Sequence, residues 1–136
     1  AVRAVAADTP PAFAHPLMPF SDRLVACMET PYFQERFDNL LALKDSDEPF
    51  LKRVGEGTSH GAPGSAFAVM SFFQRVRHAS LRECLDAELT LSMNMLEHGD
   101  FREGVRALLV DKDRNPQWAF DAIRDIDLGW IAKILP

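Results

Sequence analysis

Glu88 is the side chain whose type and position indicate most about chemistry in this sequence. At 100° per residue, the helix expected around it places Glu88 and Ser92 near the middle of a broad apolar arc. A carboxylate in such an arc must be paired or hydrogen-bonded, because an isolated buried charge is very costly. We predict a structural ion pair between Glu88 and Arg106 of the following helix; the alternative is a carboxylate that faces a substrate.

The other reactive side chains form no recognisable catalytic or metal site. Ser59 and His60 are neighbours in sequence, but adjacency is not the geometry of a nucleophile and its base. Cys27 and Cys84 lack CxxC spacing, which favours two small core residues over a disulfide or a zinc site. The histidines share no ligand spacing and are expected at the surface or at helix ends: His15, His60, His78 and His98. The sequence therefore assigns no catalytic residue, no metal and no cofactor.

A charged turn, Asp111-Lys112-Asp113-Arg114, follows the helix that is expected to contain Arg106. Cations near a helix C-terminus interact favourably with the helix dipole, which is the first interpretation of Lys112. Its two flanking aspartates reduce the local positive potential.

The elements that position these residues are all predicted to be helical, so the fold class is all-α with about six helices. Residues 1–20 are predicted to form an extended Pro/Ala-rich arm, and residues 21–136 one helical domain. In its first half, Ser21 is expected to cap a helix to Met28, and Thr30-Pro31 to open the next. A turn from 45 to 49 and a short helix from 50 to 54 follow, and the glycines from 55 to 64 predict a loop.

In the second half, a helix is expected from Ser65 to His78. Ser80 and Glu83 form a capping box that opens the longest helix, ending near His98. Asp100 and Glu103 suggest a second capping box, on a short helix whose Phe101 and Val105 would dock on the long one. The tail from 121 to 135 is predicted to be helical with a break near residue 125.

The composition and net charge limit the classes of function that this sequence can have. The chain has 136 residues, 47% of them hydrophobic and 26% charged, with a net charge of −5. This balance fits a globular, cytoplasmic-type protein and argues against a nucleic-acid surface, which usually shows clustered Lys and Arg. No apolar stretch approaches the ~20 residues that a membrane-spanning helix needs.

The strongest pattern is the run from Asp100 to Asp113, which continues to Pro116 and Trp118. It resembles the C-terminal signature of the crotonase (enoyl-CoA hydratase/isomerase) superfamily. Its Glu-Gly-Val-Arg-Ala…Asp-Lys-Asp…Pro…Trp order is most similar to the 3-hydroxyisobutyryl-CoA hydrolase branch. The run 80–92, including Glu88, resembles the family helix that precedes the signature. Ala62-Pro63-Gly64-Ser65 stands where relatives have a Ser-Pro-x-Ser turn and departs from it at its first residue.

The resemblance implies thioester chemistry, in which two backbone N–H groups form an oxyanion hole for an acyl-CoA carbonyl. In the family these groups lie in a β-rich N-terminal core, and none of that core is in this sequence. The chain is thus expected to be the C-terminal helical part of a 3-hydroxyisobutyryl-CoA hydrolase-like enzyme of valine breakdown, inactive alone. Its implied partners are the N-terminal core, acyl-CoA as the substrate, and further copies in a homo-oligomer, with no nucleic acid or membrane. The implied location is bacterial cytoplasm or the mitochondrial matrix.

The resemblance also implies a second interpretation of Lys112, as a contact to the CoA nucleotide, where an ammonium suits a phosphate. Two alternatives to the hydrolase stay open: an enoyl-CoA hydratase/isomerase, and a non-catalytic family member that binds protein neighbours. Helices that cover a missing core should expose a large apolar face.

Overall fold

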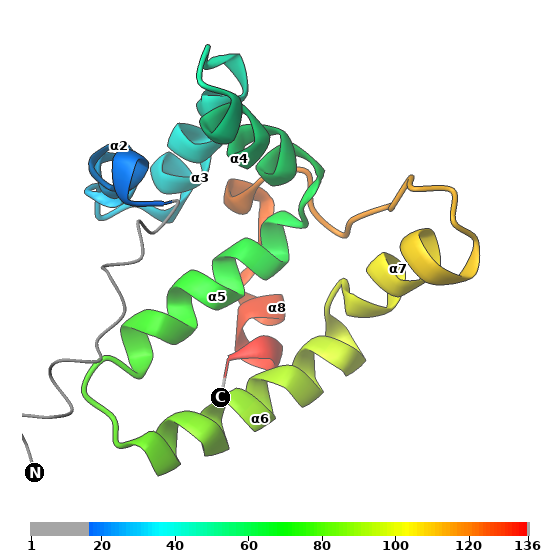
Figure 1. The fold of residues 1–136 in the computed structure, drawn as a ribbon. Coiled ribbons are helices and arrows are strands. Elements are labelled where there is room, and N and C mark those ends of the chain that lie inside the picture. The colour runs from blue at the N-terminus through cyan, green and yellow to red at the C-terminus, as the bar shows by residue number, and fades with distance from the viewer. Residues whose placement is uncertain (1–16, 136) are drawn as a thin grey trace, which may run out of the picture.

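The computed structural model describes residues 17–135, and the expected arm falls mainly on residues 1–16, which lie outside that range. The described residues contain helices and no strand, so the all-α prediction is confirmed. The α-helices are α2 (Ser21–Met28), α3 (Phe33–Ala42), α4 (Pro49–His60), α5 (Pro63–Arg75), α6 (Leu81–His98), α7 (Phe101–Val105) and α8 (Leu128–Ile134) (Figure 1). The last residues of the expected arm differ from the prediction, because Met18–Phe20 form a 3-10 turn.

Helices α2, α3 and α4 surround a small core of Cys27, Leu43 and Leu51. Leu43 lies in a 3-10 turn, Leu43–Asp45, that links α3 to α4. Phe20, just before α2, stacks on Phe50 of α4 with ring centroids 4.7 Å apart. These contacts bury Cys27 as a free thiol, as expected for a small core residue.

The predicted loop from Gly55 to Gly64 is wrong, because α4 continues through Gly55 and Gly57 to His60. Gly55 is needed for packing rather than for a turn: a Cβ there would lie 2.0 Å from the Lys44 backbone nitrogen. A Cβ at Gly57, in contrast, would meet no atom within 4 Å. Glycine in a helix lowers its intrinsic stability, so here the tight approach of two backbones outweighs local propensity.

The structure contains one of the N-caps predicted for these helices and differs from the prediction at two others. Ser80 and Glu83 form the predicted capping box, in which the Glu83 carboxylate accepts from the Ser80 N–H at 2.8 Å. Ser21 instead lies inside the first turn of α2 and donates its hydroxyl to the Met18 carbonyl. Tyr32, not Thr30, stands at the start of α3, although the Thr30 hydroxyl accepts from the Tyr32 N–H.

A second core joins α5, α6 and α8 around Ala68, Leu91, Trp130 and Ile134. The Trp130 indole N–H donates to the His98 carbonyl at 3.1 Å, and its ring meets Phe120 edge-on. The predicted break in the tail is present, as a 3-10 turn at Ile123–Asp125 followed by α8.

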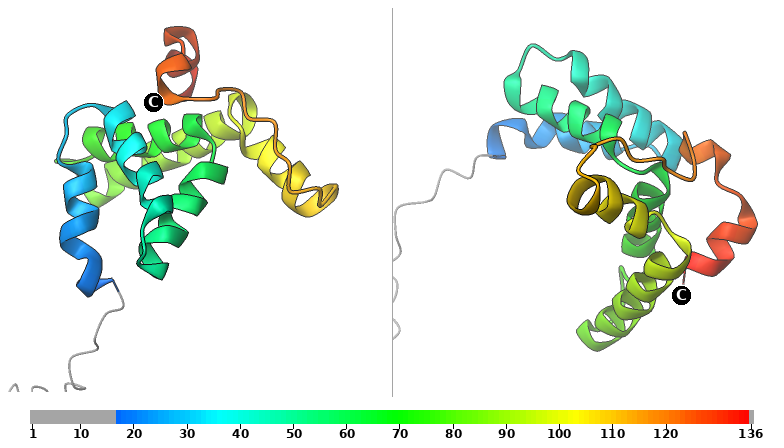
Figure 2. Two further views of the ribbon diagram at one scale, coloured as in Figure 1. Left: turned by 90° about the horizontal axis from the view of Figure 1, so that it is seen from above. Right: turned by 90° about the vertical axis from the view of Figure 1, so that its right-hand side faces the viewer.

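Helices α5 and α6 separate as they leave their connecting turn, and α8 lies between them (Figure 1). The two further views show the segment after α7 returning toward the first residues of α5 (Figure 2). Among the described residues, no helix is both long and apolar enough to cross a bilayer.

Large apolar side chains are exposed on α5, α6 and the region of α7. On α6, Leu81, Leu85, Leu89 and Met93 recur at four-residue intervals with 56–76% of their surface exposed. This spacing places them along one side of the helix. The expected exposed apolar face is therefore present on the described part of the chain.

Candidate functional site

The segment from Asp100 to Trp118 folds around one arginine. It begins with the single turn of α7 and widens into a π-helical turn, Arg106–Val110, in which the Asp111 N–H donates to the Arg106 carbonyl at 2.8 Å. π-helical turns are rare and are found mostly inside α-helices, often at functional sites. After this turn the chain reverses and runs back past α7.

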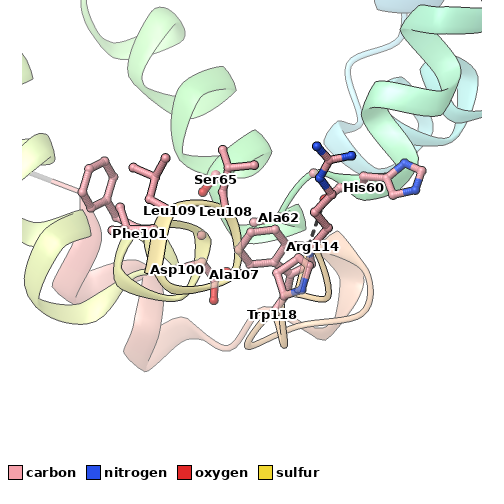
Figure 3. Close-up of a pocket in the computed structure, with 14 residues that line it drawn as sticks. His60, Ala62, Ser65, Asp100, Phe101, Ala107, Leu108, Leu109, Arg114 and Trp118 are labelled. Carbon is pink, nitrogen blue, oxygen red and sulfur yellow. Dashed lines mark hydrogen bonds between the residues drawn. The ribbon is translucent and has the colours of Figure 1, made fainter. Parts of the chain in front are cut away.

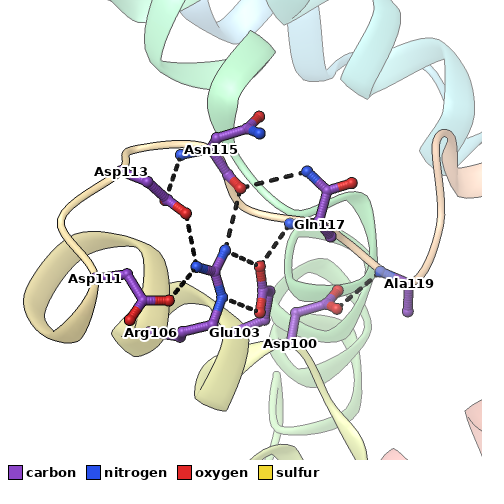
Figure 4. A network of polar contacts seen from close by, with 8 residues as sticks. All are labelled: Asp100, Glu103, Arg106, Asp111, Asp113, Asn115, Gln117 and Ala119. Atoms are coloured by element: carbon purple, nitrogen blue, oxygen red, sulfur yellow. Dashed lines mark hydrogen bonds and ion pairs between the residues drawn. The ribbon is translucent and has the colours of Figure 1, made fainter.

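Arg106 binds three carboxylates of its own segment (Figure 4). Its Nε and Nη2 donate to the two Glu103 carboxylate oxygens at 2.9 and 2.7 Å, a bidentate pairing. Its Nη1 donates to Asp111 at 2.6 Å and to Asp113 at 2.7 Å. Arg106 also reaches the Asn115 carbonyl, so its planar fork of donors joins the helix to the returning chain.

The arrangement shifts the proton affinity of its members. Hydrogen bonds from Arg106 and from the Gln117 N–H lower the pKa of Glu103 from 4.5 to about 2. Hydrogen bonds from Arg106 and the Asn115 N–H also lower the pKa of Asp113. Hydrogen bonds to the three carboxylates in turn raise the pKa of Arg106.

The predicted Glu88–Arg106 ion pair is not formed. Glu88 is exposed on α6, and the salt bridges of Arg106 go to Glu103, Asp111 and Asp113. The apolar arc that suggested burial of Glu88 is itself largely exposed in this chain. The missed signal was local, since Glu103 and Arg106 have the three-residue spacing at which helical side chains meet.

Asp100 starts α7 but does not cap it, so the second predicted capping box is wrong. Its side chain is buried, with 6% exposed, and one carboxylate oxygen accepts from the Ala119 N–H at 2.9 Å. The other oxygen has no hydrogen-bond partner within residues 17–135 and lies beside Gly64, in the first turn of α5. The positive end of the α5 dipole favours an anion at that place. Glu103, the expected second member of the box, is engaged by Arg106.

Lys112 and Arg114 adopt left-handed backbone conformations, with φ of 57° and 54°. Non-glycine residues in this region cost about 1 kcal/mol or more, which surrounding contacts must offset. Here the Asp111 and Asp113 side chains on either side turn to Arg106, and the Arg114 N–H donates to the Ala107 carbonyl at 3.0 Å. Lys112 is left exposed at the tip of the turn.

An apolar pocket of about 530 Å³ lies between the start of α5 and the α7 segment (Figure 3). Its walls include Phe101, Leu108 and Leu109. These three side chains are 55–63% exposed. The expected burial of Phe101 against α6 is therefore not observed. Trp118 closes one side, and its indole N–H donates to the His60 carbonyl at 3.1 Å. Such a pocket can hold an apolar group, and it offers no paired nucleophile and base.

Ser59 and His60 do not form a catalytic pair. The His60 Nδ1 lies 2.7 Å from the Glu56 carbonyl, so that nitrogen must carry the proton and donate it. The Ser59 hydroxyl donates to the same carbonyl at 2.7 Å. The Ser59 hydroxyl oxygen lies 3.2 Å from the His60 Nδ1, which is already engaged with the Glu56 carbonyl. In residues 17–135, no group of three His, Cys, Asp or Glu side chains is placed to hold a metal ion.

The comparisons with known proteins agree on one family. The profile of the family described as enoyl-CoA hydratase/isomerase matches residues 1–135. The mitochondrial 3-hydroxyisobutyryl-CoA hydrolase of Dictyostelium discoideum is 39% identical over 95 residues, which are 69% of this chain and 24% of that protein. The 3-hydroxyisobutyryl-CoA hydrolase-like protein 5 of Arabidopsis thaliana is 32% identical over 89 residues, 63% of this chain and 23% of that one.

A solved structure shares the fold. The crystal structure of an enoyl-CoA hydratase from Rhodobacter sphaeroides 2.4.1 superposes with a TM-score of 0.71 and 24% identity, covering 98% of this chain and 41% of the other. The chain thus spans about a quarter of the length of the curated relatives and less than half of that solved chain.

Proposed function

The chain belongs to the enoyl-CoA hydratase/isomerase family, and on that premise we propose that it is the C-terminal helical part of a 3-hydroxyisobutyryl-CoA hydrolase-like thioesterase. The observation that carries this proposal is the 39% identity to the Dictyostelium hydrolase over 95 residues. The reaction is the hydrolysis of a short hydroxyacyl-CoA in valine breakdown. The location is the mitochondrial matrix or the bacterial cytoplasm.

In this proposal the chain covers the acyl-CoA cleft and the preceding core performs the chemistry. The exposed apolar face is the kind of surface that covers another structural layer. We expect the 136-residue chain to be inactive by itself.

Lys112 is our proposed contact to the CoA nucleotide. It is exposed at the tip of the turn, and the hydrogen bonds of Asp111 and Asp113 are directed to Arg106. Together with Arg114, it brings the formal charge of this cluster to zero, because three carboxylates otherwise outnumber Arg106. An ammonium in that position can approach a phosphate as a point charge.

The test is a chimaera in which this chain replaces the segment that it matches in the Dictyostelium hydrolase. We expect the chimaera to hydrolyse 3-hydroxyisobutyryl-CoA and the 136-residue chain alone to release no free CoA. The hydrolase lacking that segment is the control and should be inactive or insoluble. Thioesterase activity of the chain alone, or a folded chimaera that hydrates enoyl-CoA and cleaves no thioester, would contradict the proposal.

A further inference from the structure

The diverging helices α5 and α6 leave a second apolar hollow, which shares the Phe101 side chain with the pocket beside α7. Its volume is about 610 Å³, and Val69, Phe72 and Phe73 of α5 face Leu91, Met95 and Leu96 of α6 across it. Two polar residues, Glu88 and Ser92, complete the α6 wall, and no cation lines it. We call this hollow the α5–α6 groove.

The groove continues into a wider apolar surface. Phe73 is 68% exposed on α5, and Leu85 and Leu89 beside Glu88 are 56% and 64% exposed on α6. Contiguous apolar surface of this kind marks an interaction site, because its exposure to water is unfavourable. A covering layer would remove Glu88 from water together with its apolar neighbours.

A buried Glu88 requires a partner that the described part of the chain does not supply. Arg106 already binds three carboxylates, and Glu88 enters none of the ion pairs within residues 17–135. Leaving one carboxylate unpaired under an apolar cover is strongly unfavourable, so the covering layer must bring a donor. Charge complementarity makes that donor an arginine or a lysine.

We propose that the α5–α6 groove seats the preceding core of the longer family protein, and that Glu88 accepts a salt bridge from a basic side chain of that core. This inference rests on the proposed function only in assuming that the chain is part of a longer family protein. This chain covers 41% of the solved chain whose fold it shares. More than half of such a protein therefore remains as a possible occupant of the groove.

A second copy of this chain fits the groove less well. A two-fold contact centred on Glu88 would bring the same patch of both copies together. Two carboxylates would then meet in an apolar interface without a cation from either groove. Like charges in such an interface are strongly unfavourable.

The experiment uses the hydrolase chimaera described above, with Glu88→Gln and Glu88→Lys as variants and Glu97→Gln as the matched control. Glu97 lies on the same helix with its side chain 76% exposed, and its ion-pair contact with the His98 ring is long, at 3.8 Å. We expect Glu88→Gln to lower the melting temperature of the chimaera by several degrees and Glu88→Lys to lower it further, whereas Glu97→Gln leaves it unchanged. In the 136-residue chain alone, where Glu88 is exposed, Glu88→Gln should have no such effect.

Equal melting temperatures for Glu88→Gln and Glu97→Gln in the chimaera overturn the inference. So does a dimer of the 136-residue chain that Glu88→Lys disrupts while the chimaera is unaffected, since the occupant is then a second copy. If the chimaera is insoluble, co-expression of the chain with the remainder of the hydrolase replaces it, and the soluble complex is quantified by affinity capture on a tag of the chain. There Glu88→Lys should lower the recovery of the complex at least about tenfold, and absence of any complex overturns the inference.

Failure of the proposed function gives a different result. A chimaera that is folded, sensitive to Glu88 and inactive on thioesters supports the groove and removes the hydrolase assignment. An active chimaera that is insensitive to Glu88 supports the hydrolase assignment and overturns the inference about the groove.

Discussion

Arg106 shows how one residue organises a segment that the sequence presents only as a motif. Its guanidinium joins Glu103 on α7 to Asp111 and Asp113 beyond the helix. The order of these residues in the motif therefore has a local structural reason: the acids arrive where the arginine can bind them all. Charge-assisted, bidentate contacts of this type fix geometry as well as adding energy.

The same cluster gives a pH dependence of stability with a defined sign. Glu103 has a pKa of about 2 in the folded chain, below its ordinary 4.5, so the unfolded chain binds more protons between those values. Its contribution to stability is present above about pH 4.5 and is lost as the pH falls through about 2. We expect Glu103→Gln to lower the melting temperature at pH 7 and this difference to shrink as the pH falls toward 2.

Circular dichroism melts of both proteins at intervals from pH 7 to 2 measure this difference. Glu97→Gln is the control and should follow the wild type, because its carboxylate is exposed. A Glu103→Gln deficit that is the same at both ends of the pH range would refute the assignment.

For Lys112 we predict an effect on binding of the acyl-CoA substrate and not on stability. In the active chimaera, Lys112→Gln should raise KM for the acyl-CoA substrate a few-fold and leave kcat unchanged, because a phosphate contact is equally present in the ground and transition states. The effect should be absent for the corresponding acyl-pantetheine, which lacks the nucleotide. Lys133→Gln, on exposed α8 surface, should leave both constants unchanged; a drop in kcat for Lys112→Gln would exclude a purely binding role.

At the scale of elements, the glycines of α4 show where reasoning from local propensity fails. Glycines at 55, 57, 61 and 64 suggested one loop, because glycine is the weakest helix former after proline. The structure extends α4 to His60 because Gly55 lets its backbone approach that of the Leu43–Asp45 turn. Nothing in the local sequence distinguishes a glycine used for close packing from one used for a turn.

Gly55→Ala and Gly57→Ala should therefore have opposite effects on stability. The first forces a methyl group against backbone atoms of Leu43 and Lys44, and overpacking of this kind costs about 1–3 kcal/mol. The second adds a methyl group in open space and should stabilise α4 by up to about 1 kcal/mol. Urea unfolding monitored by circular dichroism separates them, and a destabilising Gly57→Ala or a neutral Gly55→Ala would count against this helix packing.

For the whole molecule, the decisive feature is the apolar surface on α5 and α6. Its members follow the helical repeat that sequence patterns detect, yet they are exposed here. The interior is divided instead between two small cores, one under α2–α4 and one around Trp130. The chain thus folds as a helical layer with one face still uncovered.

That face predicts association of the isolated chain. We expect sedimentation velocity to show a concentration-dependent shift to larger species, together with binding of a hydrophobic dye. Leu89→Gln, in the middle of the face, should reduce both without changing helix content. Leu128→Gln, at an 83% exposed position in the first turn of α8, should leave association unchanged, and a strictly monomeric wild type without dye binding would contradict the prediction.

Local patterns in the sequence were sufficient for the all-α class, the long capped helix from Ser80, the tail broken near residue 125 and the family of the 100–118 motif. These features depend on residues close together in the chain, or on a repeat set by helix geometry. Tertiary structure alone decided why Gly55 is a glycine and that Glu88 is exposed. Each of these depends on which surfaces meet across the fold, and an apolar stripe on one helix does not say whether its cover belongs to the same chain.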